Sequence, residues 1–388
     1  MEQFDYIETE KKYLMQTYKR SSFVLEHGKG SYVWDTNGNK YLDMIGGVAT
    51  CSIGHSNPTL VKAIFRQAEK LINASNLFYT EPQLALAKKL SEISGLDKCF
   101  FSNSGSEAVE AAIKLAKKVT KKSKIIAMKN GFHGRTLGSL SATWKESYKA
   151  PFSPLIPGFE HVDYGDIDAL QSQISEDTAA VILEPIQGEA GVIVPPPGYL
   201  KKVEELCKKN NILLILDEIQ TGNGRTGKYF CFQHEDISPD IITLAKGIAN
   251  GLPIGVTLSK RSINFNPGDH GSTFGGNSLC CAAALKTIEL IENILLDVEP
   301  KGNYFMSKLN SIKSDNIKEV RGKGLMVALE LNKKDKSIAE KCAKKGLLIN
   351  CIDEKILRFL PPLTITQNEI DFCITVLESV LVGGDSDD

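Results

Sequence analysis

Two segments of the chain each end in a residue that can do chemistry. The apolar run 212–216 is followed directly by Asp217, and the run 241–245 by Lys246. Runs of this length are typical of buried strands, so both side chains are expected at strand ends. A lysine amine can bond covalently to an aldehyde, and a carboxylate can keep a pyridine nitrogen protonated. The two groups are the minimum needed to hold pyridoxal phosphate (PLP).

A third element is the segment Ser102–Glu107, which precedes small apolar residues at helical spacing. Ser104 and Glu107 have the spacing of a capping box, so a helix is predicted to begin here. The free amide groups of a first helical turn attract anions, and Gly105 would let a phosphate approach the backbone. Alone, this pattern is more typical of an ordinary helix cap; the aspartate and lysine favour a phosphate site.

Two further loops follow predicted strands, where open α/β sheets bind their ligands. In the segment 130–136, Phe132 can stack on a flat cofactor and Arg135 can bind a carboxylate through two parallel hydrogen bonds. His133 is interpreted as structural rather than catalytic. Glu184 ends another predicted strand and is equally compatible with a salt bridge and with a site role. The six histidines are scattered, so no metal site is expected.

The glycine-rich loop 222–228 matches G-x-G-x-x-G and the first part of a phosphate-binding Walker A loop. The Walker reading fails because Tyr229 follows Lys228 where a serine or threonine must bind magnesium. The dinucleotide reading fails because the loop is separated from its strand and precedes a poor helix start. Neither nucleotide function is expected.

Two more segments leave alternatives open. The segment Gly271–Gly276 precedes a predicted long helix and is either a flexible turn or a second source of phosphate donors. Arg358 lies in an apolar setting, where an unpaired guanidinium would be costly. Either a local acid pairs with Arg358, or it binds an anionic substrate.

The elements that must position these residues follow from apolar periodicity. A small hairpin is predicted near residues 31–42, and helices from Pro58 and from about Pro82. Continuous apolar runs then alternate with amphipathic helices, which indicates a mostly parallel sheet between helices. The runs expected as strands are 124–127, 180–183, 212–216, 241–244 and 254–258.

A long helix is expected over about 277–296, followed by a smaller α+β unit. Its predicted elements are strands at 325–331, 347–351 and 356–360, a helix at 336–345 and a last helix. Residues 1–55 are expected to join this small domain, with 56–285 forming the large domain and 286–388 the rest of the small one. The tail 383–388 is predicted to be disordered.

Bulk composition excludes several function classes. The chain has 388 residues, a hydrophobic fraction of 42% and a formal net charge of −1, so no global field favours nucleic acid or anionic lipid. No apolar run is long enough to span a bilayer. Nine cysteines form no CxxC pair, and the acidic N-terminus lacks a signal-peptide core. We therefore expect a cytoplasmic protein.

Taken together, these segments resemble the class III (ornithine-type) aminotransferases over almost the whole chain. No single motif would suffice, but their order is specific. The matching segments are 75–83, 102–107, 132–135, 184–189, 216–220 with 222–227, 245–247, 270–276 and 321–326. The resemblance implies a PLP fold-type-I homodimer, α/β in class, whose active sites lie at the subunit interface.

The resemblance also implies the cofactor contacts. Lys246 looks like the lysine that binds PLP covalently, and Asp217 like the partner of its ring nitrogen. The other implied contacts are Gln220 to the ring oxygen, Phe132 stacked on the ring, and Gly105 and Ser106 to the phosphate.

Substrate contacts are implied in the same way. Thr273, with Ser272 beside it, would reach the cofactor or substrate from the neighbouring subunit. Arg358 would hold the substrate α-carboxylate, and Arg135 the second carboxylate of glutamate or 2-oxoglutarate. Glu189 would serve as a gate that pairs with Arg358 when an amine end must be read instead.

The implied reaction moves the terminal amino group of N2-acetyl-L-ornithine to 2-oxoglutarate, a step of arginine biosynthesis. Ornithine, succinylornithine, a carrier-bound lysine intermediate and 4-aminobutyrate are alternative donors. An aminomutase of the glutamate-semialdehyde type and a non-enzymatic nucleotide-binding module are the competing classes. Enzymes acting on free ornithine have a tyrosine near the entrance, where this chain has Gly47–Val48; that difference favours the acetylated donor.

Overall fold

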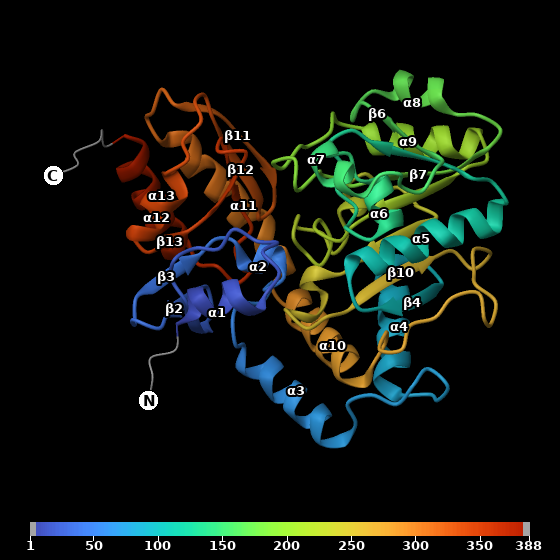
Figure 1. Ribbon diagram of the computed structural model, residues 1–388, viewed down its shortest axis with the longest axis horizontal. Helices are drawn as coiled ribbons and strands as arrows, with labels where there is room; N and C mark the ends of the chain where they lie inside the picture. The colour runs from blue at the N-terminus through green and yellow to red at the C-terminus, as the bar shows by residue number, and fades with distance from the viewer. Residues whose placement is uncertain (1–4, 383–388) are drawn as a thin grey trace.

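A seven-stranded sheet forms the centre of the larger part of the protein, which we describe from a computed structural model covering residues 5–382 (Figure 1). The predicted disordered tail, 383–388, lies outside the described residues. In spatial order the strands are β4 (Lys98–Ser102), β10 (Gly255–Ser259), β9 (Ile241–Leu244), β8 (Leu213–Asp217), β7 (Thr178–Leu183), β5 (Lys124–Met128) and β6 (Phe159–Val162).

The sheet is mostly parallel, as predicted. Strands β9, β8, β7, β5 and β6 pair in parallel, whereas β10 runs antiparallel to both of its neighbours. All five predicted runs are strands. The short strands β4 and β6 were not predicted, because each offers few consecutive β-branched residues.

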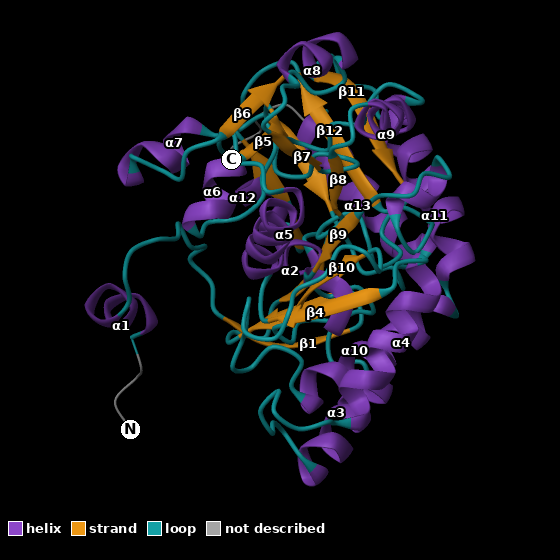
Figure 2. Cartoon of the chain, turned by 90° about the vertical axis from the view of Figure 1, so that its right-hand side faces the viewer, coloured by secondary structure: helices purple, strands orange, loops and turns teal. Residues whose placement is uncertain are grey.

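Helices cover both faces of this sheet, and alternate strand residues serve the two faces. Ile125 and Ala127 pack with residues of α5 (Gly105–Thr120), whereas Ile126 and Met128 belong to the core on the opposite side. Figure 2 shows α5 on one side of the sheet and three other helices on the other side: α4 (Glu81–Ser94), α9 (Tyr199–Lys209) and α10 (Ser278–Glu292). Burial on both faces explains the uninterrupted apolar runs.

The smaller part of the protein contains two four-stranded sheets within residues 5–382. One joins β1 (Leu25–Lys29), β2 (Tyr32–Asp35), β3 (Lys40–Asp43) and β13 (Leu347–Leu348); the other joins β11 (Ile317–Lys323), β12 (Met326–Leu331), β15 (Ile356–Phe359) and β14 (Asn350–Ile352). Since β3 pairs with β13, the N-terminal segment shares a sheet with the C-terminal part. Helices α11 (Leu295–Ser311), α12 (Ile338–Lys344) and α13 (Gln367–Leu381) complete it.

The predicted long helix at 277–296 is wrong in length, because it is two helices. Helix α10 ends at Glu292, and α11 begins at Leu295. Helix α10 packs on α3 (Pro58–Lys70) and α4, whereas α11 packs on β11 and α13, so the chain must change direction between them. The expected division between residues 285 and 286 falls within α10 and stays a prediction. Strand β11 was missed because its sequence is largely polar.

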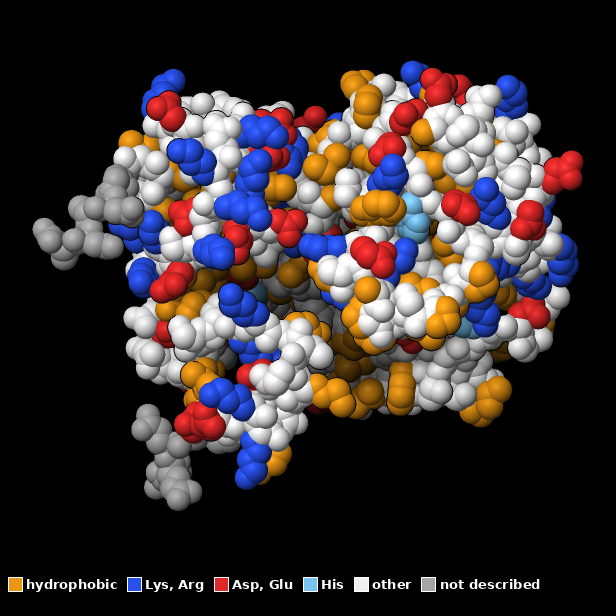
Figure 3. Space-filling view, turned by 45° about the horizontal axis from the view of Figure 1, so that its top comes forward, with side chains coloured by type: hydrophobic (Ala, Val, Ile, Leu, Met, Phe, Trp, Pro, Cys, Tyr) orange, Lys and Arg blue, Asp and Glu red, His pale blue; other side chains and the backbone are white. Residues whose placement is uncertain are grey.

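The remaining helices are short: α1 (Tyr6–Tyr13), α2 (Gly46–Ala49), α6 (Leu137–Ala142), α7 (Glu146–Lys149) and α8 (Ile167–Gln173), with 3-10 turns at Ala150–Phe152, Cys231–His234 and Lys246–Ala249. Within residues 5–382, none of the helices has the length and apolar character needed to cross a bilayer. Acidic and basic side chains alternate over the face in Figure 3.

Candidate active site

A cavity of about 310 Å³ opens at the carboxyl ends of the parallel strands. Its volume suits a small flat ligand. The chain segments that line it follow strands β5, β7, β8 and β9, or belong to the start of α5, to the end of α2 and to the loop before β10. Among the lining residues are Thr50, Gly105, Ser106, Phe132, His133, Glu184, Glu189, Asp217, Gln220 and Lys246. The structure therefore brings seven of the predicted site residues, together with Glu184 and His133, to one cavity.

Asp217 is the last residue of β8 and is 3% exposed. One carboxylate oxygen lies 2.8 Å from Nδ1 of His133, and the other accepts hydrogen bonds from the Thr243 hydroxyl at 3.2 Å and the Ile219 amide at 3.1 Å. These partners hold the carboxylate in one orientation. A buried, well-held acid of this kind can face a cationic ring nitrogen.

Lys246 follows β9 after one residue and has a left-handed backbone, with φ of 46°. The carbonyl before it accepts a hydrogen bond from the Asn223 side chain at 3.1 Å, which fixes the turn. Burial lowers the pKa of Lys246, with Glu189 opposing and Arg358 reinforcing this shift. A lysine whose neutral form is favoured is better suited to act as a nucleophile and as a base.

The anion-binding end of the cavity is the start of α5. The Ser104 hydroxyl caps the helix by accepting from the Glu107 amide at 3.2 Å. The Glu107 carboxylate reaches one residue further back than expected and accepts from the Asn103 amide at 2.9 Å. A Cβ at Gly105 would lie 2.8 Å from Ile219, so a side chain would crowd this wall. Ser106 accepts from the Arg135 amide at 3.1 Å.

Glu184 is buried and connects two loops of the site. Its carboxyl oxygens accept from the Phe132 amide at 2.9 Å and the Gly188 amide at 3.0 Å. Burial raises its pKa to about 7, and neighbouring Asp217 contributes in the same direction, whereas His133 opposes the shift. The alternative left open by the sequence is resolved here: Glu184 has no ion-pair partner among residues 5–382 and braces the site.

Arg358 and Glu189 form an ion pair at 2.7 Å. Arg358, on β15, is 3% exposed and also donates to Asn350 at 3.1 Å and to the Gly188 carbonyl at 3.1 Å. The Gln220 amide lies between the two partners, accepting from Arg358 at 3.4 Å and donating to Glu189 at 3.5 Å. Of the two alternatives left open for Arg358, the structure shows an acid partner, and this partner is Glu189, as the resemblance implied.

Arg135 lies in a different setting. Its side chain is exposed, and no carboxylate of residues 5–382 lies within ion-pair distance. Its guanidinium carbon is 3.4 Å from the ring centroid of Tyr148 and 5.9 Å from that of Phe132. Arg135 is thus ordered by ring contacts and not by a counter-charge.

Ser272 and Thr273 do not line the cavity of their own chain. Ser272 accepts hydrogen bonds from the Asn103 side chain at 3.2 Å and the Gly275 amide at 3.0 Å, and Thr273 is exposed. The expectation that these residues act on a neighbouring subunit is not tested by a single chain, and it stays a prediction.

The glycine-rich loop 222–228 is structural, in agreement with the rejection of both nucleotide readings. A 3-10 turn and not an α-helix follows it, at Cys231–His234. Arg225, 2% exposed, donates to the backbone carbonyls of Leu325 at 3.1 Å and Pro361 at 2.5 Å. The loop therefore joins the large part of the protein to the C-terminal part.

Three site features were missed from the sequence: the imidazole of His133 paired with Asp217, the Thr243 hydroxyl beneath it, and Tyr148 against Arg135. The only available signal was that His133 lies in a loop with two glycines that follows a predicted strand. No group of three or more potential metal ligands occurs in residues 5–382.

The residues present fit PLP. An anion site at a helix start, an amine and a buried acid line one cavity, and Phe132 lies beside them. The model of the aminotransferase class-III family matches residues 13–381. The chain belongs to the class III aminotransferases. It is accordingly a PLP-dependent aminotransferase of fold type I.

Curated relatives and solved structures are similar over almost the full length of this aminotransferase. The acetylornithine aminotransferase of Methanothermobacter thermautotrophicus is 49% identical over 98% of this chain and 99% of its own. That of Aquifex aeolicus is 45% identical over 95% and 100%. The structure of ornithine aminotransferase from Toxoplasma gondii superimposes with a TM-score of 0.94 at 35% identity, covering 97% of this chain and 94% of its own.

A solved acetylornithine aminotransferase, from Elizabethkingia anophelis, has a TM-score of 0.87 at 37% identity and covers 98% of both chains. Another Toxoplasma gondii ornithine aminotransferase structure is described as having PLP in partial occupancy at the active site. Enzymes named for ornithine and for acetylornithine thus share this architecture.

Proposed function

We propose that this aminotransferase moves the terminal amino group of N2-acetyl-L-ornithine to 2-oxoglutarate, giving N-acetyl-L-glutamate 5-semialdehyde and L-glutamate. The observation that carries the proposal is the ion pair that the buried Arg358 forms with the partly exposed Glu189, next to Lys246. With Arg358 neutralised, the end of the site next to Lys246 favours a substrate that has no carboxylate beside its reacting amine. The terminal amine of an ornithine derivative meets this condition. The identity to acetylornithine aminotransferases supports the acetylated form.

The two half-reactions then differ in the state of the Arg358–Glu189 ion pair, which is closed in one and open in the other. The donor would bind while Glu189 pairs with Arg358, its own α-carboxylate reaching Arg135 at the far end. Glutamate and 2-oxoglutarate carry a carboxylate at the reacting end, so Glu189 would release Arg358 to bind it. Arg135 would hold the second carboxylate of these acids.

The proposed catalytic residues are Lys246 and Asp217. When bound, PLP supplies an electron sink for the charge left on carbon after a proton leaves. Asp217, held by His133 and Thr243, would keep a proton on the ring nitrogen. Lys246, its pKa lowered by burial, would accept the proton from the substrate carbon that bears the reacting nitrogen and return it to the carbon on the other side of that nitrogen. Gly105 and Ser106 would bind the phosphate, Phe132 would stack on the ring and Gln220 would bind the ring oxygen.

Donor choice is tested by steady-state kinetics with N2-acetylornithine, ornithine, succinylornithine and 4-aminobutyrate as donors and 2-oxoglutarate as acceptor. We expect the highest kcat/KM for acetylornithine. Faster turnover of free ornithine would contradict the proposal and favour the activity named for the Toxoplasma gondii structure. Turnover without any added keto acid would indicate an aminomutase instead.

The anchoring lysine is tested with Lys246→Ala, which should abolish transamination and the visible absorbance of the bound cofactor. The exposed Lys202→Ala variant serves as a control and should keep both. Borohydride reduction and peptide mapping should label Lys246 in the wild type. Label on another lysine would reject this assignment.

A homodimer with shared active sites is part of the proposal. An apolar surface supports it: in segment 71–79 and the neighbouring loop, Leu77 is 87%, Tyr79 93% and Phe274 61% exposed. Such residues are costly to leave in water, and Thr273 adjoins Phe274. A second copy that covers this surface would bring Ser272 and Thr273 towards its own site.

The shared site is tested by complementation. Dimers of Lys246→Ala and dimers of Thr273→Glu should each be inactive, because the first lacks the lysine and the second carries a repelling acid. Mixed dimers, isolated with two affinity tags, would have one intact site and should recover activity. Inactive mixed dimers would contradict the action of Thr273 across subunits.

We also propose a cytoplasmic location. All nine cysteines lie within the described residues and are unpaired, in keeping with a reducing compartment. Fractionation of the source cells with an antibody to the protein would test this.

A further inference from the structure

Arg135 has an unusual support for a residue expected to bind a carboxylate. Its guanidinium carbon lies 3.4 Å from the ring centroid of Tyr148, which is contact distance for a stacked pair. The ring covers one face of the guanidinium. The N–H groups point along the plane of the guanidinium and stay available, so a carboxylate can still bind through two parallel hydrogen bonds.

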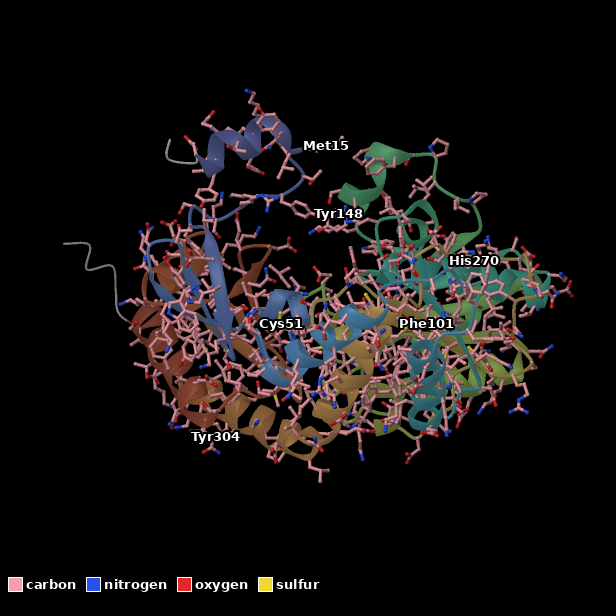
Figure 4. The ribbon with its side chains drawn as sticks, turned by 90° about the horizontal axis from the view of Figure 1, so that it is seen from below. Met15, Cys51, Phe101, Tyr148, His270 and Tyr304 are labelled. Carbon is pink, nitrogen blue, oxygen red and sulfur yellow. The ribbon has the colours of Figure 1, made fainter. Side chains whose placement is uncertain are left out.

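Tyr148 is itself held in place. It belongs to α7, and its ring meets the Phe132 ring edge-on, with centroids 6.3 Å apart and an interplanar angle of 85°. Lys145, three residues earlier, pairs with Asp353 of the small part of the protein at 3.2 Å, and its ammonium lies 5.4 Å from the centroid of the Tyr148 ring. Tyr148 lies on the side of α7 that faces the N-terminal strands (Figure 4). The ring is therefore held against Phe132, which lines the cavity.

We propose that Tyr148 is a positioning residue that sets the specificity of this enzyme for substrates with a distal carboxylate. Its ring holds the Arg135 guanidinium in place for a carboxylate without neutralising the charge. An acidic partner would compete with the substrate for the guanidinium, whereas an aromatic face does not. The inference rests on the proposed function, in which Arg135 binds the distal carboxylate.

The ring, not the hydroxyl, carries this role. Among residues 5–382 the Tyr148 hydroxyl makes no hydrogen bond, whereas the ring contacts Arg135 and Phe132. Tyr148→Phe keeps these contacts, and Tyr148→Ala removes them. Phe152→Ala removes an exposed ring from the adjoining 3-10 turn and controls for general disturbance of the segment.

The experiment compares two keto acids as amino acceptors for the full-length holoenzyme. The first is 2-oxoglutarate, and the second is 2-oxopentanoate, which has the same chain length but lacks the distal carboxylate. For Tyr148→Ala we expect KM for 2-oxoglutarate to rise roughly three- to tenfold while KM for 2-oxopentanoate and the cofactor absorbance stay unchanged. Tyr148→Phe and Phe152→Ala should stay within about twofold of wild type for both acids.

If Tyr148→Ala raised KM equally for the two keto acids, Tyr148 would have a merely structural role acting through Phe132. That result would overturn the inference. Unchanged KM values would overturn it as well. Arg135→Ala separates this failure from that of the proposed function. If Arg135→Ala raises KM for 2-oxoglutarate and Tyr148→Ala does not, only the proposed role of Tyr148 is wrong. If Arg135→Ala has no effect, the proposed roles of both residues are wrong.

Discussion

Arg358 and Arg135 lie in opposite environments in this protein. Arg358 is buried, hydrogen-bonded and paired with Glu189 at 2.7 Å. Arg135 is exposed and rests on the ring of Tyr148 at 3.4 Å. One guanidinium is therefore masked by a charge that can be moved away, whereas the other is held ready by a neutral surface.

The difference shows how one cavity can serve two kinds of substrate. A buried cation without a partner is costly, so Arg358 requires either Glu189 or a substrate carboxylate. An exposed cation keeps its hydration and needs no such exchange. A removable counter-ion suits the end of the site where the two half-reactions differ, and a fixed support suits the end where they do not.

The largest effect is expected from Arg358→Ala. It removes the group proposed to bind the α-carboxylate of 2-oxoglutarate and leaves Glu189 unpaired, so kcat/KM with this acceptor should fall on the order of 100-fold or more. The rate constant of the acetylornithine half-reaction, measured in single turnovers, should decrease much less. Equal decreases in the rates of both half-reactions would mean that Arg358 does not bind a carboxylate of 2-oxoglutarate alone.

A smaller effect is expected from Glu189→Gln, which keeps the shape of the gate but removes its charge. Arg358 would then stay unneutralised and disfavour the positively charged amine, slowing the acetylornithine half-reaction roughly tenfold. The 2-oxoglutarate half-reaction should be maintained or improved. A gate variant that slowed only the 2-oxoglutarate side would contradict the assigned role.

Arg135→Lys should act on both half-reactions and more weakly. Lysine keeps the charge but loses the planar stack on Tyr148 and the paired hydrogen bonds to a carboxylate. We expect KM for acetylornithine and for 2-oxoglutarate to rise together by about five- to tenfold, with kcat little changed. A change in KM confined to one substrate would mean that Arg135 does not bind a carboxylate of both substrates.

The smallest effect on activity is expected from the ionisation of Glu184, whose carboxyl group connects the loops that carry Arg135 and Glu189. The expected change is in stability. Burial raises its pKa from 4.5 to about 7, so between these values the folded protein retains a proton that the unfolded chain has lost. Its contribution to stability is complete below pH 4.5 and is lost as pH rises to about 7, by on the order of 3 kcal/mol.

Glu184→Gln lacks this titration. The unfolding free energy of wild type relative to the variant should therefore decrease between pH 5 and pH 8. Denaturant unfolding at the two pH values measures the difference. A difference that stayed constant between the two pH values would mean that Glu184 is already ionised in the folded protein at pH 5.

Local sequence was enough to predict several parts of the site. Apolar runs ended at Asp217 and just before Lys246, and the structure has strands there. Ser104 was predicted to begin a helix and caps α5. These features depend on residues close together in the chain, so their patterns are readable. The predicted long helix failed because its two halves pack on different parts of the protein.

The sequence by itself determined the family, the strand ends that carry the acid and the amine, and the residues able to bind carboxylates. Only the tertiary structure decided that His133 orients Asp217, that Glu184 links the Phe132 and Gly188 amides, and that Tyr148 supports Arg135. Most of these partners lie far apart in the chain, and whether their side chains meet depends on how the loops pack over the sheet, which no local pattern encodes.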